Sequence, residues 1–148
     1  FKGVRRRFTY KIKTDELILI DDYAHHPAEI EAVHQAVREM HPGKKVLAVF
    51  QPHLFSRTRD FGDDFAKSLA KFDELLLLDI YPAREQPIEG IDSVWLFDQI
   101  KMNTKSLITK EQLSEEVKKS DASVIVMMGA GDIGEEVEPL KKILLNEK

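Results

Sequence analysis

Cysteine is absent from the 148 residues of this chain, which excludes a disulfide framework, a thiolate metal site and a cysteine nucleophile. No apolar stretch approaches the roughly 20 residues of a membrane-spanning helix, so we expect no membrane span and no signal peptide. The net charge of −4 argues against a nucleic-acid partner, because phosphate binding needs a concentrated basic face. These absences favour a cytoplasmic domain whose functional side chains carry nitrogen or oxygen groups and no thiol.

A phosphate-binding loop of the form Gly-x-x-x-x-Gly-Lys-Ser/Thr is also missing, so the chain cannot activate a nucleoside triphosphate by that route unaided. The length suggests one domain with a core of ordinary size. The chain begins with Phe1 instead of methionine, and we therefore expect a piece of a longer protein. Residues 1–8 contain three consecutive arginines and are predicted to be a hinge or linker, with the domain proper at 9–148.

Short apolar runs alternate with helical periodicity along most of the sequence. A half-exposed strand and a returning buried strand come first and predict a hairpin, and repeated strand–helix units follow. The predicted fold class is therefore α/β, a Rossmann-like, mostly parallel sheet with helices on both faces and an N-terminal hairpin. The expected strands are 8–13, 16–20, 46–50, 74–78, 106–108 and 123–128; the expected helices are 27–40, a stripe through 61–72, 93–102, 110–119 and 132–146.

Acidic and imidazole side chains crowd the junction after the second expected strand, in the sequence Asp21-Asp22-Tyr23-Ala24-His25-His26-Pro27. Ligands of open α/β sheets bind at the carboxyl ends of the strands, which makes this junction a candidate site. A metal site is one interpretation, since imidazole and carboxylate both bind divalent ions. A helix cap or turn bonds to the backbone are the structural alternatives.

The segment Gly129-Ala130-Gly131-Asp132-Ile133-Gly134 formally matches a dinucleotide-binding fingerprint after a strand. That fingerprint belongs to a first strand–helix turn and needs an acidic residue about 20 positions later, after a second strand. The chain ends before such a strand could form. A tight turn, whose amides could still face an anion, is the favoured interpretation.

Five motifs taken together carry a family resemblance. They are Phe1-Lys2-Gly3-Val4-Arg5-Arg6-Arg7-Phe8, Asp21-Asp22-Tyr23-Ala24-His25-His26-Pro27, Phe50-Gln51-Pro52-His53-Leu54-Phe55-Ser56-Arg57-Thr58, Tyr81-Pro82-Ala83-Arg84-Glu85 and Gly129-Ala130-Gly131-Asp132. In order and spacing, the sequence resembles the carboxyl-terminal domain of the Mur ligases over essentially its whole length. Within that family it is most similar to the members that join L-alanine to UDP-N-acetylmuramate.

The resemblance implies a cytoplasmic, three-domain enzyme of peptidoglycan precursor synthesis that works through an acyl phosphate. An N-terminal domain would hold the UDP-sugar, and a central domain would carry the ATP phosphate loop and the Mg²⁺ ligands. This domain would close over the site, would be inactive in isolation and would hold no metal or tightly bound cofactor. Arg6 and Arg7 would contact ATP at the hinge, and Asp22 would accept the ribose hydroxyls.

The same resemblance places four side chains against the amino acid and the acyl intermediate: Tyr23, His25, His53 and Arg57. Arg57 would pair with the alanine carboxylate, whereas Leu54 stands where relatives often have arginine, which removes a second carboxylate contact. No residue is assigned a catalytic step. Further residues that would line the cleft are His26, Gly129, Gly131 and Asp132.

Three alternatives stay open from the sequence. A murein-recycling ligase would add a peptide to the same UDP-sugar. A non-catalytic nucleotide-binding module would bind ATP without the other domains. A metal-dependent hydrolase would use the histidines and carboxylates of the first junction as ligands.

Overall fold

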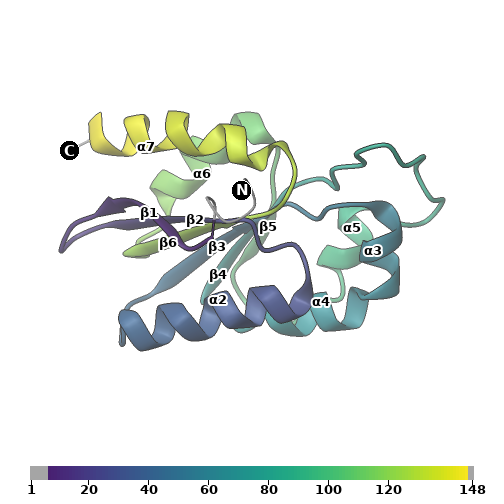
Figure 1. Ribbon diagram of the computed structural model, residues 1–148, viewed down its shortest axis with the longest axis horizontal. Helices are drawn as coiled ribbons and strands as arrows, with labels where there is room; N and C mark the ends of the chain where they lie inside the picture. The colour runs from purple at the N-terminus through teal and green to yellow at the C-terminus, as the bar shows by residue number, and fades with distance from the viewer. Residues whose placement is uncertain (1–6, 147–148) are drawn as a thin grey trace.

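The computed structural model describes residues 7–146, and within them a six-stranded sheet has the order β1-β2-β6-β3-β4-β5 (Figure 1). β1 is antiparallel to β2, and every other neighbouring pair is parallel. This confirms the predicted fold class. The strands are β1 (Thr9–Lys13), β2 (Ile18–Asp22), β3 (Val46–Phe50), β4 (Glu74–Leu77), β5 (Lys105–Leu107) and β6 (Val124–Met128).

Helices cover both faces of the sheet, as Figure 1 shows, with α6 and α7 on one side and α2 and α4 on the other. The change of side occurs after β5, so that the connection to β6 runs over the opposite face. The helices are α2 (Pro27–Met40), α3 (Phe55–Asp60), α4 (Gly62–Leu69), α5 (Ser93–Phe97), η1 (Lys110–Gln112), α6 (Leu113–Lys119), η2 (Asp132–Glu136) and α7 (Val137–Asn146).

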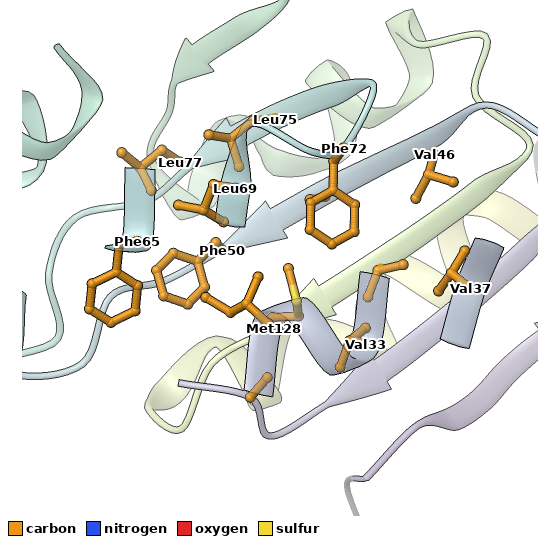
Figure 2. Close-up of a cluster of buried hydrophobic side chains, with 14 of the residues drawn as sticks. Val33, Val37, Val46, Phe50, Phe65, Leu69, Phe72, Leu75, Leu77 and Met128 are labelled. Atoms are coloured by element: carbon orange, nitrogen blue, oxygen red, sulfur yellow. The ribbon is translucent and has the colours of Figure 1, made fainter. Parts of the chain in front are cut away.

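The central strands are buried on both faces, because each face packs against a helix layer. On one face, Val33 and Val37 of α2 and Leu69 of α4 belong to one buried cluster with Phe50 and Met128 (Figure 2). On the other face, α6 and α7 cover a second apolar cluster. The buried residues of α2 recur at helical spacing, as predicted from the sequence. Pro27 lies in the first turn of this helix.

Strand β2 is longer at its carboxyl end than expected. Asp21 and Asp22 were predicted in the loop, but both lie in β2 and are buried. The reason is the parallel pairing with β6, which continues to Met128 opposite Asp22. The site therefore begins on the sheet itself and not on a loop beyond it.

The stripe predicted through 61–72 is confirmed for Phe65, Leu69 and Phe72, which are buried, but the helix itself is shorter and spans only Gly62–Leu69. The chain breaks at Phe61 into α3 and α4, and Phe61 is 37% exposed. A Cβ on Gly62 would lie 2.6 Å from the Trp95 ring, so a close approach of α5 requires glycine at the start of α4. The helix expected at 93–102 is also shorter and ends at Phe97, and the Lys105 ammonium donates to the carbonyls of Phe97 and Ile100 at 2.7 Å each.

The connections after β2 and β6 lead to opposite faces, although these two strands are neighbours. Such a switch point opens a crevice at the carboxyl ends of the strands, where ligands of open α/β sheets bind. The Asp21–Asp22 pair, the 51–58 motif and the 129–132 turn all lie at this edge. Of the helices in 7–146, none has the length and apolar character to cross a membrane.

Candidate active site at the carboxyl edge of the sheet

Asp22 is the last residue of β2 and is 5% exposed. Its Oδ2 accepts a hydrogen bond from the backbone N–H of Phe8 at 2.7 Å, and its Oδ1 accepts one from Ala24 at 2.8 Å. Burial raises the pKa of Asp22 above its usual value, and these two bonds and the Arg7 charge oppose that rise only in part. A carboxylate oxygen can accept more than one hydrogen bond, so Asp22 remains able to receive ligand hydroxyls.

A cleft of about 300 Å³ opens beside Asp22. Arg7 and Tyr23 line it together with Glu29, and small side chains of α2 such as Ala28 form its apolar wall. The cleft therefore combines a cation, two carboxylates and an apolar surface, which suits a nucleoside with an anionic tail. Arg6, the other predicted hinge contact, lies outside the described residues.

His25 and His26 point to different neighbours. The His25 ring lies 5.3 Å from the Tyr23 ring and 5.9 Å from the His53 ring, both edge to face. His26 caps α2 through Nδ1, which accepts from the Ala28 N–H at 3.4 Å, and its ring lies 4.8 Å from Phe61. The edge therefore brings Tyr23, His25 and His53 together, while His26 serves the helix start.

His53 is held by the neighbouring strand connection. A parallel bridge joins it to Tyr81, and the two rings lie 5.6 Å apart. Burial, the Arg57 charge and His25 lower the pKa of His53, which favours the neutral imidazole. Among the residues described, its buried Nδ1 has no hydrogen-bond partner. Arg57, on α3, donates to the His53 carbonyl at 3.4 Å, so its guanidinium stays near the ring.

The start of α3 is fixed by two unusual features. Leu54 has a positive φ of 76°, which is rare for a branched side chain and marks a strained connection. The Ser56 N–H donates to Glu85 at 3.1 Å, and the Ser56 hydroxyl donates to the other oxygen of the same carboxylate. The 81–85 motif therefore ties down the helix that carries Arg57.

The 129–132 turn packs tightly against the 51–53 segment. A Cβ on Gly131 would lie 2.6 Å from both Gln51 Oε1 and Tyr81 Cγ, which explains glycine at that position. Gln51 is 4% exposed; its amide donates to Asp132 at 2.7 Å and accepts from the Ile133 N–H at 3.1 Å. Glycine here serves close packing, as expected for a tight turn.

Both oxygens of Asp132 have protein partners, because Lys110 donates to Oδ2 at 2.6 Å. Burial would raise the pKa of Asp132, but the bonds from Gln51 and Lys110 hold it below the usual range. Asp132, Gly129 and Gly131 do lie at the predicted edge, and their ligand contacts stay a prediction. Within residues 7–146, no cluster of three or more His, Asp or Glu side chains could hold a metal ion.

The sequence motifs located most of this edge but not its internal supports. Gln51 and Tyr81 belong to the five motifs and Glu29 lies just after the Asp21–Pro27 motif, but the sequence assigns none of the three a supporting contact, because these contacts join residues far apart in the chain or in one loop. Lys110 had no signal in the sequence, since it lies 22 residues from Asp132 in the chain. These supports depend on which strands are neighbours.

Comparison with protein families gives a match over residues 6–131 to the family described as "Mur ligase, glutamate ligase domain". Among curated relatives, UDP-N-acetylmuramate–L-alanine ligase of Christiangramia forsetii is 72% identical over 147 residues, 99% of this chain and 32% of that protein. The ligase of the same name from Flavobacterium johnsoniae is 65% identical over 144 residues, 97% of this chain and 32% of its own. The chain thus spans about a third of the length of these relatives.

Solved structures show the same fold. UDP-N-acetylmuramate–alanine ligase of Thermotoga maritima superimposes with a TM-score of 0.78 at 26% identity, over 97% of this chain and 30% of that one. A murein peptide ligase of Psychrobacter arcticus gives a TM-score of 0.74 at 16% identity, over 99% of this chain and 31% of its own. The second likeness is one of fold alone.

Proposed function

The chain belongs to the Mur ligase family, and we propose that it is the domain that closes over the substrates in an enzyme that joins L-alanine to UDP-N-acetylmuramate. Relatives at 72% and 65% identity carry that name, which supports the alanine-adding member. The full enzyme would be cytoplasmic and would act in peptidoglycan precursor synthesis, with N-terminal and central domains preceding this one. Residues 1–8 would form the hinge.

In the proposed reaction, ATP phosphorylates the muramoyl carboxylate to an acyl phosphate, and the alanine amine then displaces phosphate to form the amide. The acyl phosphate is open to hydrolysis, so the domain has to hold nucleotide and amino acid in register and exclude water. Mg²⁺ would be held by the central domain and would neutralise charge on the transferred phosphoryl group. The residues of this chain would then bind and orient the nucleotide and the amino acid.

The cleft beside Asp22 is the proposed nucleotide side. Asp22 would accept the ribose hydroxyls, and Arg7, with Arg6, would contact the phosphates, since guanidinium groups bind phosphate oxygens in pairs. The fixed carboxylate of Asp22 supports this assignment, because both its oxygens are oriented by backbone N–H groups before any ligand arrives.

The group formed by Tyr23, His25, His53 and Arg57 is the proposed amino-acid side. The carrying observation is that ring contacts and the Arg57–His53 bond bring these four side chains, from two distant motifs, to one edge of the sheet. Arg57 would hold the alanine carboxylate, and the imidazoles would face the amine. His26 and the Gly129, Gly131 and Asp132 turn would border the same space.

The test uses the full-length enzyme. We expect alanine-dependent ADP release, and Arg57→Ala should raise the KM for alanine by about one to two orders of magnitude, because a charge-assisted pair contributes roughly 1.5–3 kcal/mol. Arg59→Ala is the matched control, since Arg59 is exposed and pairs with Asp60. Unchanged alanine kinetics in Arg57→Ala would refute the assignment.

Two alternative functions can be distinguished from the proposed one by further assays. A murein-recycling ligase would accept a tripeptide in preference to alanine when both are offered. A non-catalytic nucleotide module would bind ATP tightly with this 148-residue chain alone, whereas a ligase domain should bind ATP weakly without the central domain.

A further inference from the structure

The hydrogen bonds of His25 fix its imidazole in one tautomer. Nδ1 lies 2.9 Å from the carbonyl oxygen of Tyr23 and 3.4 Å from Oε1 of Glu29. A carbonyl and a carboxylate can only accept, so Nδ1 has to carry the hydrogen. In the neutral ring, the lone pair is then on Nε2, across the ring from these partners.

Glu29 holds this arrangement from a second direction. Its Oε1 also accepts the backbone N–H of His25 at 3.0 Å, so one carboxylate oxygen binds both the main chain and the ring side of the same residue. The His25 side chain is 22% exposed and that of Glu29 37% exposed, so both are partly accessible to solvent, and Glu29 also lines the cleft beside Asp22. A carboxylate behind an imidazole both orients it and stabilises the imidazolium ion that forms when Nε2 takes a proton.

The reaction needs such a group, because an amino acid arrives as an ammonium ion with no lone pair for attack. On the proposed ligase function, we infer that His25 is the general base that takes this proton through Nε2, and that Glu29 is its positioning residue. One proton passes from the ammonium to Nε2. The amine lone pair then forms the C–N bond, the C–O bond to phosphate breaks with its electron pair leaving on phosphate, and the nitrogen's extra proton goes to that phosphate.

His53 is the competing imidazole at this edge, and its surroundings differ. No acceptor orients its Nδ1 within residues 7–146, and Arg57 stands beside it. The Arg57 guanidinium contributes to the lowered pKa of His53, whereas the group beside Nδ1 of His25 is the Glu29 carboxylate. The groups facing His25 are Glu29 from α2, Tyr23 from its own segment and His53 from the connection after β3, with Arg57 beyond His53.

The first experiment measures alanine-dependent turnover of full-length His25→Gln against wild type from about pH 7 to about pH 9. At the lower pH we expect a loss of roughly 100-fold, as for removal of a general base. The ratio of wild type to variant should then shrink by about tenfold per pH unit, because solvent supplies more free amine as pH rises. His34→Gln is the matched control, since His34 lies farther along α2 and contacts Arg38 and Phe72.

Hydroxylamine in place of alanine gives an independent readout. It is largely unprotonated near neutral pH and needs no base, so His25→Gln should form the hydroxamate within about threefold of wild type. Glu29→Gln should lose about tenfold with alanine, recover with pH in the same way and also keep hydroxylamine turnover. Glu39→Gln, on the same helix, should behave as wild type.

Several outcomes would overturn the inference. A wild-type to His25→Gln ratio that does not change with pH would mean that His25 only binds. Equal loss with alanine and hydroxylamine would place the defect before aminolysis. Recovery with pH in His53→Gln but not in His25→Gln would assign the base to His53. If wild type itself shows no alanine-dependent turnover, the proposed function fails instead.

Discussion

The Oδ2 atom of Asp22 lies 2.7 Å from the backbone nitrogen of Phe8 and accepts its hydrogen. The bond joins the segment before β1 to the carboxyl end of β2, 14 residues apart in the chain. Ala24 donates to the other oxygen, so the carboxylate orientation is set from both sides. Phe8 is thereby attached to the side of the candidate site that we propose for the nucleotide.

Asp22→Ala in the full-length enzyme should raise the KM for ATP by about tenfold or more, with a smaller effect on the KM for alanine. The variant loses the proposed ribose acceptor and leaves two backbone N–H groups without it, a loss of roughly 1–3 kcal/mol. Steady-state kinetics with each substrate varied in turn check the order of the two effects. Asp63→Ala, exposed on α4, is the control, and a larger effect on alanine would reject the ribose role.

Gln51→Leu should lower the unfolding free energy of the 148-residue chain by about 2–3 kcal/mol. It removes two hydrogen bonds, and the buried Ile133 N–H is left without its acceptor. Urea unfolding followed by circular dichroism measures the change. Gln35→Leu removes an exposed amide that donates to Glu39, and it should shift stability by less than about 0.5 kcal/mol. Equal shifts in the two variants would contradict a structural role for Gln51.

Asp132 should contribute to the acid sensitivity of the fold. Its pKa is held below the ordinary value of 3.8 by Gln51 and Lys110, against the effect of burial. The native chain therefore binds this proton less tightly than the unfolded chain does. The stabilisation is present above about pH 4 and is lost as pH falls through the lower, folded pKa.

The measurement is the urea midpoint of wild type and Asp132→Asn between about pH 6 and about pH 2. Other carboxyl groups with lowered pKa values, such as Asp73, lose stability in both proteins. The wild-type midpoint should fall more steeply than that of the variant below about pH 4. Parallel curves would show that the Lys110–Asp132 pair makes no pH-dependent contribution.

Gly131→Ala should disturb the site through packing alone. The added Cβ would meet Gln51 and Tyr81 at 2.6 Å, and the Tyr81 ring in turn contacts His53. We expect a loss of about 1–3 kcal/mol in stability, and in the full enzyme a fall in kcat with little change in the KM for ATP. Gly43→Ala is the control for a glycine substitution without a packing clash, since Gly43 has φ of +78° and open space around it. This variant should lower stability by about 1 kcal/mol through backbone strain and leave turnover unchanged.

Local sequence patterns were enough to predict the fold class, the hairpin at the start and the five motifs that carry the family resemblance. These follow from local physics: periodicity reports which positions are buried, Pro27 fits a first helical turn, and Thr109 with Gln112 forms a capping box. The motif order also led to the family. The separate helix α3 and the break at Phe61 were not predicted, because the apolar stripe only begins at Phe61 and the packing of Trp95 on Gly62 is not local.

The position of β6, the last strand of the described residues, between β2 and β3 could not be predicted from local patterns. That placement brings the 129–132 turn to Gln51, 81 residues away from Asp132, and seats Gly131 against Tyr81. Strand order follows from which apolar faces pack best once all the helices are placed, and no local pattern records it. The strand order also brings the His25 ring next to the His53 ring. The candidate site at this edge therefore depends on contacts between residues that are far apart in the sequence.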